Sequence, residues 1–470
     1  MKYIGKNLIT ALAITLPFQA ASINLLKANT EFKNGQYDSA FSLYQEGAEV
    51  GSAHAYYQLG VMYSEGLGVK ADPISSLIYF SLAADQKYHN AESVRDAMLA
   101  ELDGEQLARV DELLGEFALR QHNEQQRYLP KIIEQNLDYK VTFNGSPALE
   151  RKFFYDMTEI DSEIVFPVGV IVSRPAFLVV ENDVATDGSV RHISKIQKTG
   201  YVNRYIDSYQ LFPFAQPQFK GEPVEFVNRA YLGAATNDKF GLIEDLPRLY
   251  GETRKIVRTA KKSDTLEDQY EYAMSMVLFP WMEEQPHQAE TLLKSLAVKG
   301  HPAAMYEYGL ELYMEQKDIP EAIKWITEAS KFGLARAEYR LGKLLMTSPW
   351  IEKDEKKALF WFESAMQKGH EAATLNAARI KITADNTSLR DIEGAMEYLE
   401  LAEKSQHLNP EYFYLLALSY KDRPDRDFAL AVKNLEQAIV MGNRTNWDTS
   451  EWEALLARMT RGKVTVTDYF

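Results

Sequence analysis

The C-terminal third of the chain has a hydrophobic pattern with a long period. An alanine recurs at intervals of 33, 36, 37 and 36 residues, at Ala289, Ala322, Ala358, Ala395 and Ala431. Seven residues after each alanine comes another small or apolar residue: Leu296, Ala329, Ala365, Ala402 and Ala438. Seven residues are about two helical turns, so both members of a pair lie on one helix face. The pattern predicts repeated α-helices.

Large side chains and glycines recur in the same frame. Three residues after the first alanine the chain has Leu292, Trp325, Trp361 and Tyr398, and eleven residues after it Gly300, Gly333, Gly369, Gln406 and Gly442. A glycine just beyond a helix suits a left-handed C-terminal cap. Since one helix pair cannot cover its own apolar face, these units must stack into a solenoid. The expected packing residues are Ala322, Trp325, Ala329, Gly333, Ala358, Trp361, Ala365 and Gly369.

The N-terminal region carries a sharper version of this scheme. Its signature residues between Ala55 and Ala84 are Leu59, Gly60, Tyr63, Gly66, Gly68 and Asp72. This stretch resembles the Sel1-like repeat, a relative of the tetratricopeptide repeat with a longer loop between its helices. A degenerate unit precedes it, and a helix at residues 101–126 is expected to seal the block. The C-terminal copies lie between the Sel1-like and tetratricopeptide forms. The resemblance implies a solenoid that binds proteins.

The helical period disappears between Val141 and Ala235. Phe177–Val180 is a short apolar run, Asp187-Gly188 is a hairpin signal, and residues 190–196 alternate as a strand does. A helix is expected at Tyr201–Phe212 and a strand at 225–227. The predicted order is strand, hairpin, strand, helix, turn and strand.

That order resembles the C-terminal domain of the TonB family. The matching residues are Asp187, Gly188, Val190, Phe214, Pro217, Gly221, Pro223 and Val224. The helix departs from the family pattern at Tyr205–Tyr209, and we see no transmembrane anchor or proline-rich spacer. The resemblance therefore implies an α+β interaction module rather than an energy-transducing protein.

The first residues have the order of an export signal. Lys2 and Lys6 precede an apolar run from Leu8 to Leu16, and small residues follow Pro17 at 20–22. We predict a cleavable signal peptide at residues 1–21. A retained membrane anchor is the alternative, although the run is about half the ~20 residues that span a bilayer. Without a cysteine to carry lipid, the product is expected to be periplasmic or secreted and not a lipoprotein.

Composition narrows the chemistry. The 470 residues include 52 Lys and Arg, 67 Asp and Glu, and no cysteine, which gives a net charge of −15. Such acidity disfavours general nucleic-acid binding. Disulfides, thiolate zinc sites, cysteine nucleophiles and iron–sulfur clusters are excluded. The eight histidines show no metal-ligand spacing, and no nucleophile elbow or phosphate loop occurs. We expect no cofactor, no metal and no enzymatic activity, although an unpatterned pair of carboxylates in a hydrolase stays open.

One stretch runs against the overall charge. Arg254, Lys255, Arg258, Lys261 and Lys262 lie close together in a region expected to be helical. They form either a solvated helix face or a contact for an acidic partner or a phospholipid headgroup.

The sequence thus predicts a mostly α protein with two solenoid blocks flanking a small α+β domain. The expected segments are a signal peptide (1–21), an N-terminal solenoid (22–136), the TonB-like domain (137–236), a helical linker (237–268) and a C-terminal solenoid (269–470). The predicted function is a protein-interaction scaffold of the cell envelope that binds proteins or peptides on a concave face near Glu307, Arg340 and Asn376. A TonB-related accessory of outer-membrane transport or export, or a cryptic envelope hydrolase, are the alternatives.

Overall fold

A computed structural model describes residues 23–104, 107–108, 110–115, 126–143, 175–212 and 214–461. The fold is mostly helical, with helices in solenoid-like repeats and a small central sheet, as the sequence predicts. The predicted signal peptide lies outside the described residues, and so does much of the helix expected at 101–126. None of the described helices combines the length and the apolarity needed to cross a membrane.

The N-terminal block consists of α1 (Leu25–Lys33), α2 (Tyr37–Glu49), α3 (Ala53–Glu65), α4 (Pro73–Asp85) and α5 (Ala91–Leu99). Asp72 caps α4 by accepting a hydrogen bond from the backbone N–H of Ile74. Gly66 follows α3 in the left-handed conformation, with φ of 69°. A side chain at Gly60 would meet the ring of Phe80 at 3.0 Å, so a small residue lets α3 and α4 approach closely.

The C-terminal block stacks helices in sequence order, each packed on the next. These are α11 (Leu266–Leu278), α12 (Gln288–Val298), α13 (Pro302–Glu315), α14 (Ile319–Lys331), α15 (Ala335–Thr347), α16 (Glu355–Gln367), α17 (Glu371–Thr383), α18 (Ile392–Gln406), α19 (Pro410–Asp422), α20 (Phe428–Arg444) and α21 (Ser450–Thr460). The repeated alanines and Trp361 are buried in the core between helices. Gly333 and Gly369 have φ of 82° and 80°, the left-handed turns expected after α14 and α16.

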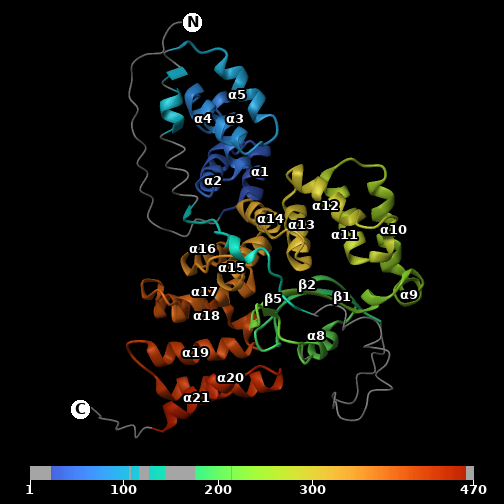
Figure 1. Cartoon of the computed structure of the whole chain (residues 1–470), viewed down its shortest axis with the longest axis vertical. Helices are drawn as coiled ribbons and strands as arrows, with labels where there is room; N and C mark the ends of the chain where they lie inside the picture. The colour runs from blue at the N-terminus through green and yellow to red at the C-terminus, as the bar shows by residue number, and fades with distance from the viewer. Residues whose placement is uncertain are drawn as a thin grey trace.

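The two blocks join directly. The backbone N–H of Leu25 donates to the carbonyl of Phe332 at 3.2 Å, and the His54 ring stacks on the Phe332 ring with centroids 5.0 Å apart. Their buried side chains belong to one continuous core. Figure 1 shows the N-terminal block above α14, with α15–α21 following below and α11–α13 to one side. The two helical blocks therefore share one core built from parts far apart in sequence.

Residues 126–143 run along this stack as a strap. The indole N–H of Trp361 donates to the carbonyl of Tyr128 at 2.8 Å, and that of Trp350 to the carbonyl of Tyr139 at 3.1 Å. The side-chain amide of Gln316 bonds both the N–H and the carbonyl of Val141. The strap contains a single 3-10 turn, Glu134–Asn136. Trp361 of the repeat pattern thus anchors a connecting segment as well as filling the core, and Trp350 provides a second anchor.

The central sheet is antiparallel, with strand order β2-β1-β5. It consists of β1 (Phe177–Val184), β2 (Val190–Thr199) and β5 (Phe226–Gly233). Between β2 and β5 the chain forms α8 (Asn203–Gln210) and a small hairpin of β3 (Gln218–Phe219) and β4 (Glu222–Pro223). The order of strands, helix and turns is the expected one. β1 extends four residues beyond the predicted end at Val180, and β5 extends far past the predicted 225–227.

The two faces of β1 meet different layers. Leu178 and Val180 pack in a core with Val202 and Tyr209 beside α8. Phe177 and Val179 pack on the other face against Leu242 and neighbours from α9 (Lys239–Asp245), α10 (Pro247–Ala260) and the end of α11. The region expected as a helical linker is therefore α9, α10 and the start of α11, packed against the sheet and the solenoid.

Candidate interaction site

The predicted concave residues lie on the first helices of successive repeats and are all buried. Glu307 on α13 is 1% exposed, Arg340 on α15 is 3% exposed and Asn376 on α17 is 2% exposed. Figure 1 shows the sheet between the arm formed by α10–α13 and the stack formed by α17–α20. The side of the solenoid on which a partner was expected is thus covered, at Glu307 and Arg340, by the chain's own sheet.

Side chains of opposite charge join the two parts. The alternation of β1 places Glu181 and Asp183 on the same face as Phe177 and Val179, toward the solenoid. We call the following group the ion cluster: Glu181, Asp183, Glu225 and Arg229 from the sheet region, and Glu307, Arg336, Arg340 and Lys343 from α13 and α15. It contains four carboxylates and four cations, so its formal charge is balanced.

Glu181 is the most heavily bonded carboxylate of the cluster. It accepts hydrogen bonds from Arg340 Nη2 at 2.7 Å, Arg336 Nη2 at 3.1 Å and the hydroxyl of Tyr306 at 2.6 Å. Burial alone would raise its pKa, but Arg340, Arg336 and Arg229 together hold the pKa of Glu181 well below the ordinary value. Glu181 therefore stays ionised in the interior, because the surrounding arginines compensate its negative charge.

Arg340 connects both acidic residues of β1 to the solenoid. Its second guanidinium nitrogen donates to Asp183, which also accepts from the Tyr339 hydroxyl at 3.2 Å. Burial by itself would lower the pKa of Arg340, yet Asp183 and Glu181 raise it well above the usual value. Glu307 accepts from Arg229 at 2.6 Å and Arg336 at 3.0 Å. Glu307 and Arg340 thus belong to one network, linked through Arg336 and Glu181.

Asn376 takes no part in this network. Its amide donates to the carbonyl of Ala372 in its own helix at 2.8 Å. Nearby, Arg379 of α17 pairs with Glu411 of α19, and the imidazole of His192 on β2 lies 4.0 Å from the same carboxylate. Burial opposes ionisation of Glu411, but Arg379 and His192 lower its pKa to about 2. A second, smaller ionic contact therefore holds β2 against the later repeats.

The motif residues of the TonB-like segment form the corner that faces these repeats. Asp187 accepts from the backbone N–H of Ser189 and of Asp448, both at 2.9 Å, and from Arg191. The Arg191 guanidinium in turn stacks on the ring of Trp447, 3.3 Å from its centroid. Gly188 has φ of 82°, and a β-carbon there would lie 2.3 Å from the carbonyl oxygen of Phe214. The resemblance to the TonB family itself stays a prediction.

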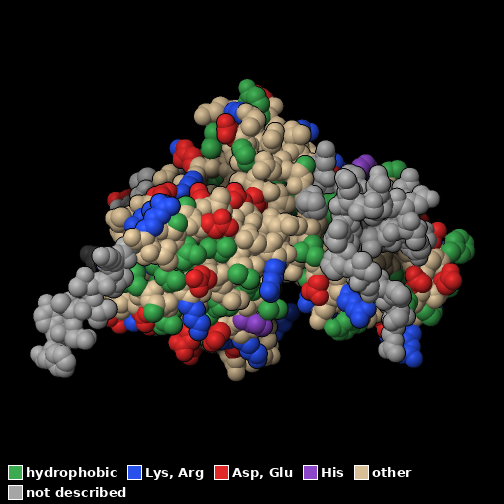
Figure 2. Space-filling view, turned by 90° about the horizontal axis from the view of Figure 1, so that it is seen from below, with side chains coloured by type: hydrophobic (Ala, Val, Ile, Leu, Met, Phe, Trp, Pro, Cys, Tyr) green, Lys and Arg blue, Asp and Glu red, His purple; other side chains and the backbone are tan. Residues whose placement is uncertain are grey.

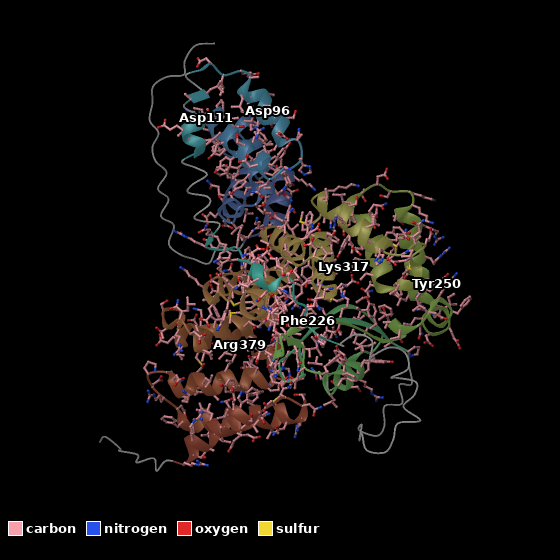
Figure 3. The ribbon with its side chains drawn as sticks, in the orientation of Figure 1. Asp96, Asp111, Phe226, Tyr250, Lys317 and Arg379 are labelled. Carbon is pink, nitrogen blue, oxygen red and sulfur yellow. The ribbon has the colours of Figure 1, made fainter. Side chains whose placement is uncertain are left out.

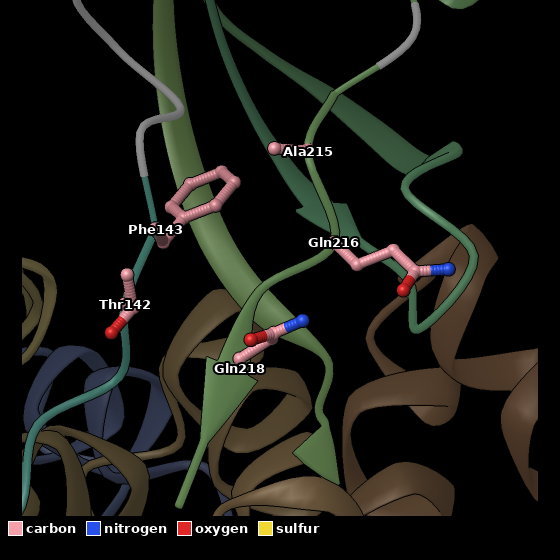
Figure 4. A pocket seen from close by; sticks show the side chains of 5 residues that line it. All are labelled: Thr142, Phe143, Ala215, Gln216 and Gln218. Atoms are coloured by element: carbon pink, nitrogen blue, oxygen red, sulfur yellow. The ribbon is translucent and has the colours of Figure 1, made fainter. Parts of the chain in front are cut away.

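The remaining motif residues shape a second turn. The backbone N–H of Val224 donates to the carbonyl of Pro217 at 2.8 Å, which closes the small hairpin around Gly221 and Pro223. Val190 is buried in the core beside α8. A hollow of about 280 Å³ lies next to this hairpin. It is lined by Thr142, Phe143, Ala215, Gln216 and Gln218 (Figure 4). No lining side chain is titratable, so these residues offer hydrogen bonds and an aromatic ring but no acid or base.

One carboxylate group has a geometry that could hold a cation. Carboxylate oxygens of Glu290, Glu311 and Glu315 lie within 4.8 Å of one another. Lys317 Nζ already lies 2.8 Å from Glu290 and bonds Glu315 as well. Burial, with Glu315 and Glu290 nearby, raises the pKa of Glu311 to about 7. A lysine and a proton thus compensate most of this acidic charge.

Sequence reasoning missed most of the ion cluster. Glu181, Asp183 and Arg229 lie in strands, but the first predicted strand ends at Val180 and the last at residue 227, before these polar residues. One signal was present: Glu181 and Asp183 continue the two-residue alternation that begins at Phe177 and Val179. In Figure 3, Phe226 of β5 lies between the labelled Lys317, just beyond α13, and Arg379 of α17.

Comparison with known proteins identifies the repeats. The family model described as Sel1 repeat matches residues 53–88, 302–331 and 335–370, which correspond to α3–α4, α13–α14 and α15–α16. No match is found among curated proteins.

Two solved structures are similar in part. A Sel1 repeat protein from Oxalobacter formigenes is 18% identical, with a TM-score of 0.33, over 43% of this chain and 82% of that chain. A protective antigen present in uropathogenic Escherichia coli strains, displaying an SLR fold, is 16% identical, with a TM-score of 0.31, over 95% of this chain and 88% of that chain. Three helix pairs of the chain thus match the Sel1 repeat.

Proposed function

We propose that this chain is a non-enzymatic interaction scaffold of the cell envelope whose own sheet fills part of the concave face of its C-terminal solenoid. Sel1 repeat proteins are generally protein–protein interaction scaffolds, which supports the general role. The ion cluster is the observation that supports a filled concave face, because it uses Glu307 and Arg340 for an intramolecular contact. Partners then bind the outer helices of the repeats and the surface that the sheet and solenoid present together.

The outer surface suits such a role. Figure 2 shows acidic, basic and hydrophobic side chains interspersed over the visible face rather than gathered by sign. Leu401 within α18 is 69% exposed, and Leu408 just beyond the end of α18 is 74% exposed. In this proposal the two exposed leucines are apolar contact points for a protein partner, with the charged side chains around them as a polar rim.

Crosslinking with mass spectrometry in the native envelope tests this proposal. We expect reproducible intermolecular crosslinks from exposed lysines of second helices such as Lys404 and Lys433, and intramolecular crosslinks alone near the sheet. The same experiment on fractionated cells tests the location: the mature chain should appear in the envelope fraction and begin after residue 21. Intermolecular crosslinks concentrated beside Glu307 and Arg340 would contradict the filled concave face.

A TonB-related accessory role is the second candidate, and the order of the sheet's elements favours it. In the described part of the chain, β2 pairs with β1 on one side and with no strand on the other. Exposed Lys195 and Lys198 lie on β2, a feature that discourages strand addition at a sheet edge. Replacing both lysines with threonine should strengthen capture of an extended peptide if the edge is a binding site. Unchanged capture would mean that the edge of β2 does not bind peptides and that the sheet only packs against the chain's own solenoid.

A further inference from the structure

The basic stretch found in the sequence forms the outer face of α10. Arg254, Lys255 and Arg258 are exposed, whereas Leu249, Thr253 and Ala260 of the same helix are buried. With 3.6 residues per turn, the exposed basic positions point away from the buried ones. Arg248, Lys261 and Lys262 extend the basic face beyond both ends of this group. We call these six residues the basic edge.

The basic edge opposes the charge of the rest of the chain. Residues 248–262 contain six basic residues and one acidic residue, Glu252, a net charge of +5. Because the whole chain carries −15, the remaining sequence carries −20. An anionic surface would therefore attract this edge and repel the rest, which orients the molecule.

Most of these cations are not used within the protein. Lys261 lies 3.8 Å from Glu284, with both side chains largely exposed. In the described part of the chain, no carboxylate lies within ion-pair distance of Arg254, Lys255, Arg258 or Lys262. Exposed pairs such as Lys261–Glu284 contribute little. The basic edge thus keeps most of its charge available to an external anion.

An apolar element lies next to the basic edge. α9 directly precedes α10, and the two helices pack together at the outer edge of the molecule (Figure 1). On α9, Phe240 is 76% exposed and Ile243 is 37% exposed. α9 itself carries Lys239 against Glu244 and Asp245, so its part in a membrane contact is the exposed Phe240 ring, and the cations come from α10. An exposed aromatic ring together with clustered lysines and arginines is the combination that enters the headgroup layer of an anionic membrane.

We propose that α9 and the basic edge form a docking surface for an anionic phospholipid bilayer. A bilayer fits better than an acidic peptide, because the cations line the outer side of a helix at the edge of the fold, where a broad flat surface can reach all of them together. The apolar side of α10 stays packed in the protein, so contact is peripheral: the cations bind headgroup phosphates and Phe240 enters the interface.

Vesicle flotation with the full chain tests the proposal. Vesicles of phosphatidylcholine containing about a third phosphatidylglycerol should bind the protein, vesicles of phosphatidylcholine alone should not, and binding should weaken as salt rises. The variant Arg254→Glu/Lys255→Glu/Arg258→Glu should reduce bound protein by at least about tenfold, since each cation near the surface contributes attraction. Phe240→Ser should weaken binding by several-fold without changing its salt dependence.

A control variant has the same net charge as the Arg254→Glu/Lys255→Glu/Arg258→Glu variant. Lys299→Glu/Lys404→Glu/Lys433→Glu changes the charge equally at exposed, scattered positions and should bind like wild type. Circular dichroism confirms that each variant is folded. Three results would overturn the proposal: no binding to the anionic vesicles, equal binding by both triple variants, or binding to a poly-glutamate peptide in place of vesicles, which would identify an acidic protein partner.

Discussion

Arg340 Nη2 lies 2.7 Å from Glu181 Oε1, across 159 residues of sequence and between a helix of the solenoid and a strand of the sheet. Both side chains are buried, so each charge has lost its water and depends on the other. This pair shows how the sheet is held: balanced charges, placed on facing elements, fix one docking position. A shifted sheet would leave several buried charges unpaired.

Removing one partner should therefore be costly. Arg340→Met leaves Glu181 and Asp183 without their main cation, and we expect the free energy of unfolding to fall by about 3–5 kcal/mol. Urea unfolding followed by tryptophan fluorescence measures the loss. The exposed Arg426→Met is the matched control and should change stability by less than about 0.5 kcal/mol.

A double-mutant cycle isolates the pair. Glu181→Gln combined with Arg340→Gln should destabilise less than the sum of the two single changes, because the second change removes the charge that the first left unpaired. The coupling should exceed about 1 kcal/mol. Additive effects would mean that the two side chains do not interact in the folded protein.

Acid should unfold the protein over a wide range of pH. Burial lowers the pKa of His54 and His370 to about 4, and Arg379 with His192 lowers that of Glu411 to about 2. A group with a depressed folded pKa stabilises fully above its unfolded pKa, and this is lost as pH falls through the folded value. Stability from the histidines should decline below about pH 6.5, and that from Glu411 between about pH 4.5 and 2. In urea titrations, Glu411→Gln should flatten the lower part of the profile; an unchanged slope there would contradict the assignment.

Glu311 should act in the opposite direction. Burial, with Glu315 and Glu290, raises its pKa to about 7, so its contribution is fully present below the unfolded pKa and is lost as pH rises through about 7. Glu311→Gln should therefore be more stable than wild type near pH 8, by at most about 3 kcal/mol, and should differ little near pH 4. Glu400→Gln on the exposed side of α18 serves as the control. A destabilised Glu311→Gln at pH 8 would mean that the carboxylate has a favourable partner.

Two glycines of the sheet module should respond differently to alanine. Both have positive φ, 82° at Gly188 and 87° at Gly221, which costs an L-residue about 1–2 kcal/mol. Gly221 has open space around it, whereas a β-carbon at Gly188 would lie 2.3 Å from the Phe214 oxygen. Gly188→Ala should thus lower the thermal midpoint clearly more than Gly221→Ala. Equal shifts would show that the turn at Gly188 is not packed against the carbonyl of Phe214.

Local sequence patterns predicted the repeats well, because the residues that pack the helices of one repeat lie close together in sequence. The alanines, tryptophans and glycines of each unit lie within eleven residues, and the structure uses them as core residues, strap anchors and left-handed turns. The ion cluster could not be predicted in the same way. Glu181 and Arg340 become neighbours only after the whole chain has folded, and no spacing within one element records that contact.

The strands too were predictable only where a local sequence pattern defines them. Apolar residues marked where β1 begins, but Glu181, Asn182 and Asp183 continue it because each finds a polar partner. Glu181 and Asp183 bond residues of the solenoid, and Asn182 accepts from Tyr209 of α8 on the other face. Asn376 was placed on the concave face by its repeat position, and its amide instead bonds its own helix. Repeat position thus locates a residue on the solenoid, whereas its contacts depend on what lies opposite.

The absence of cysteine allows the central claim to be tested directly with engineered thiols. Asn446 Nδ2 lies 3.0 Å from the carbonyl oxygen of Leu211, so these positions join the sheet module to the end of the solenoid. In Leu211→Cys/Asn446→Cys, a short bismaleimide should crosslink the two thiols nearly completely in the folded chain. Leu211→Cys/Asp96→Cys, with α5 at the opposite end of the fold, should not crosslink (Figure 1). A folded Leu211→Cys/Asn446→Cys protein that stays uncrosslinked would contradict the docking of the sheet within the solenoid.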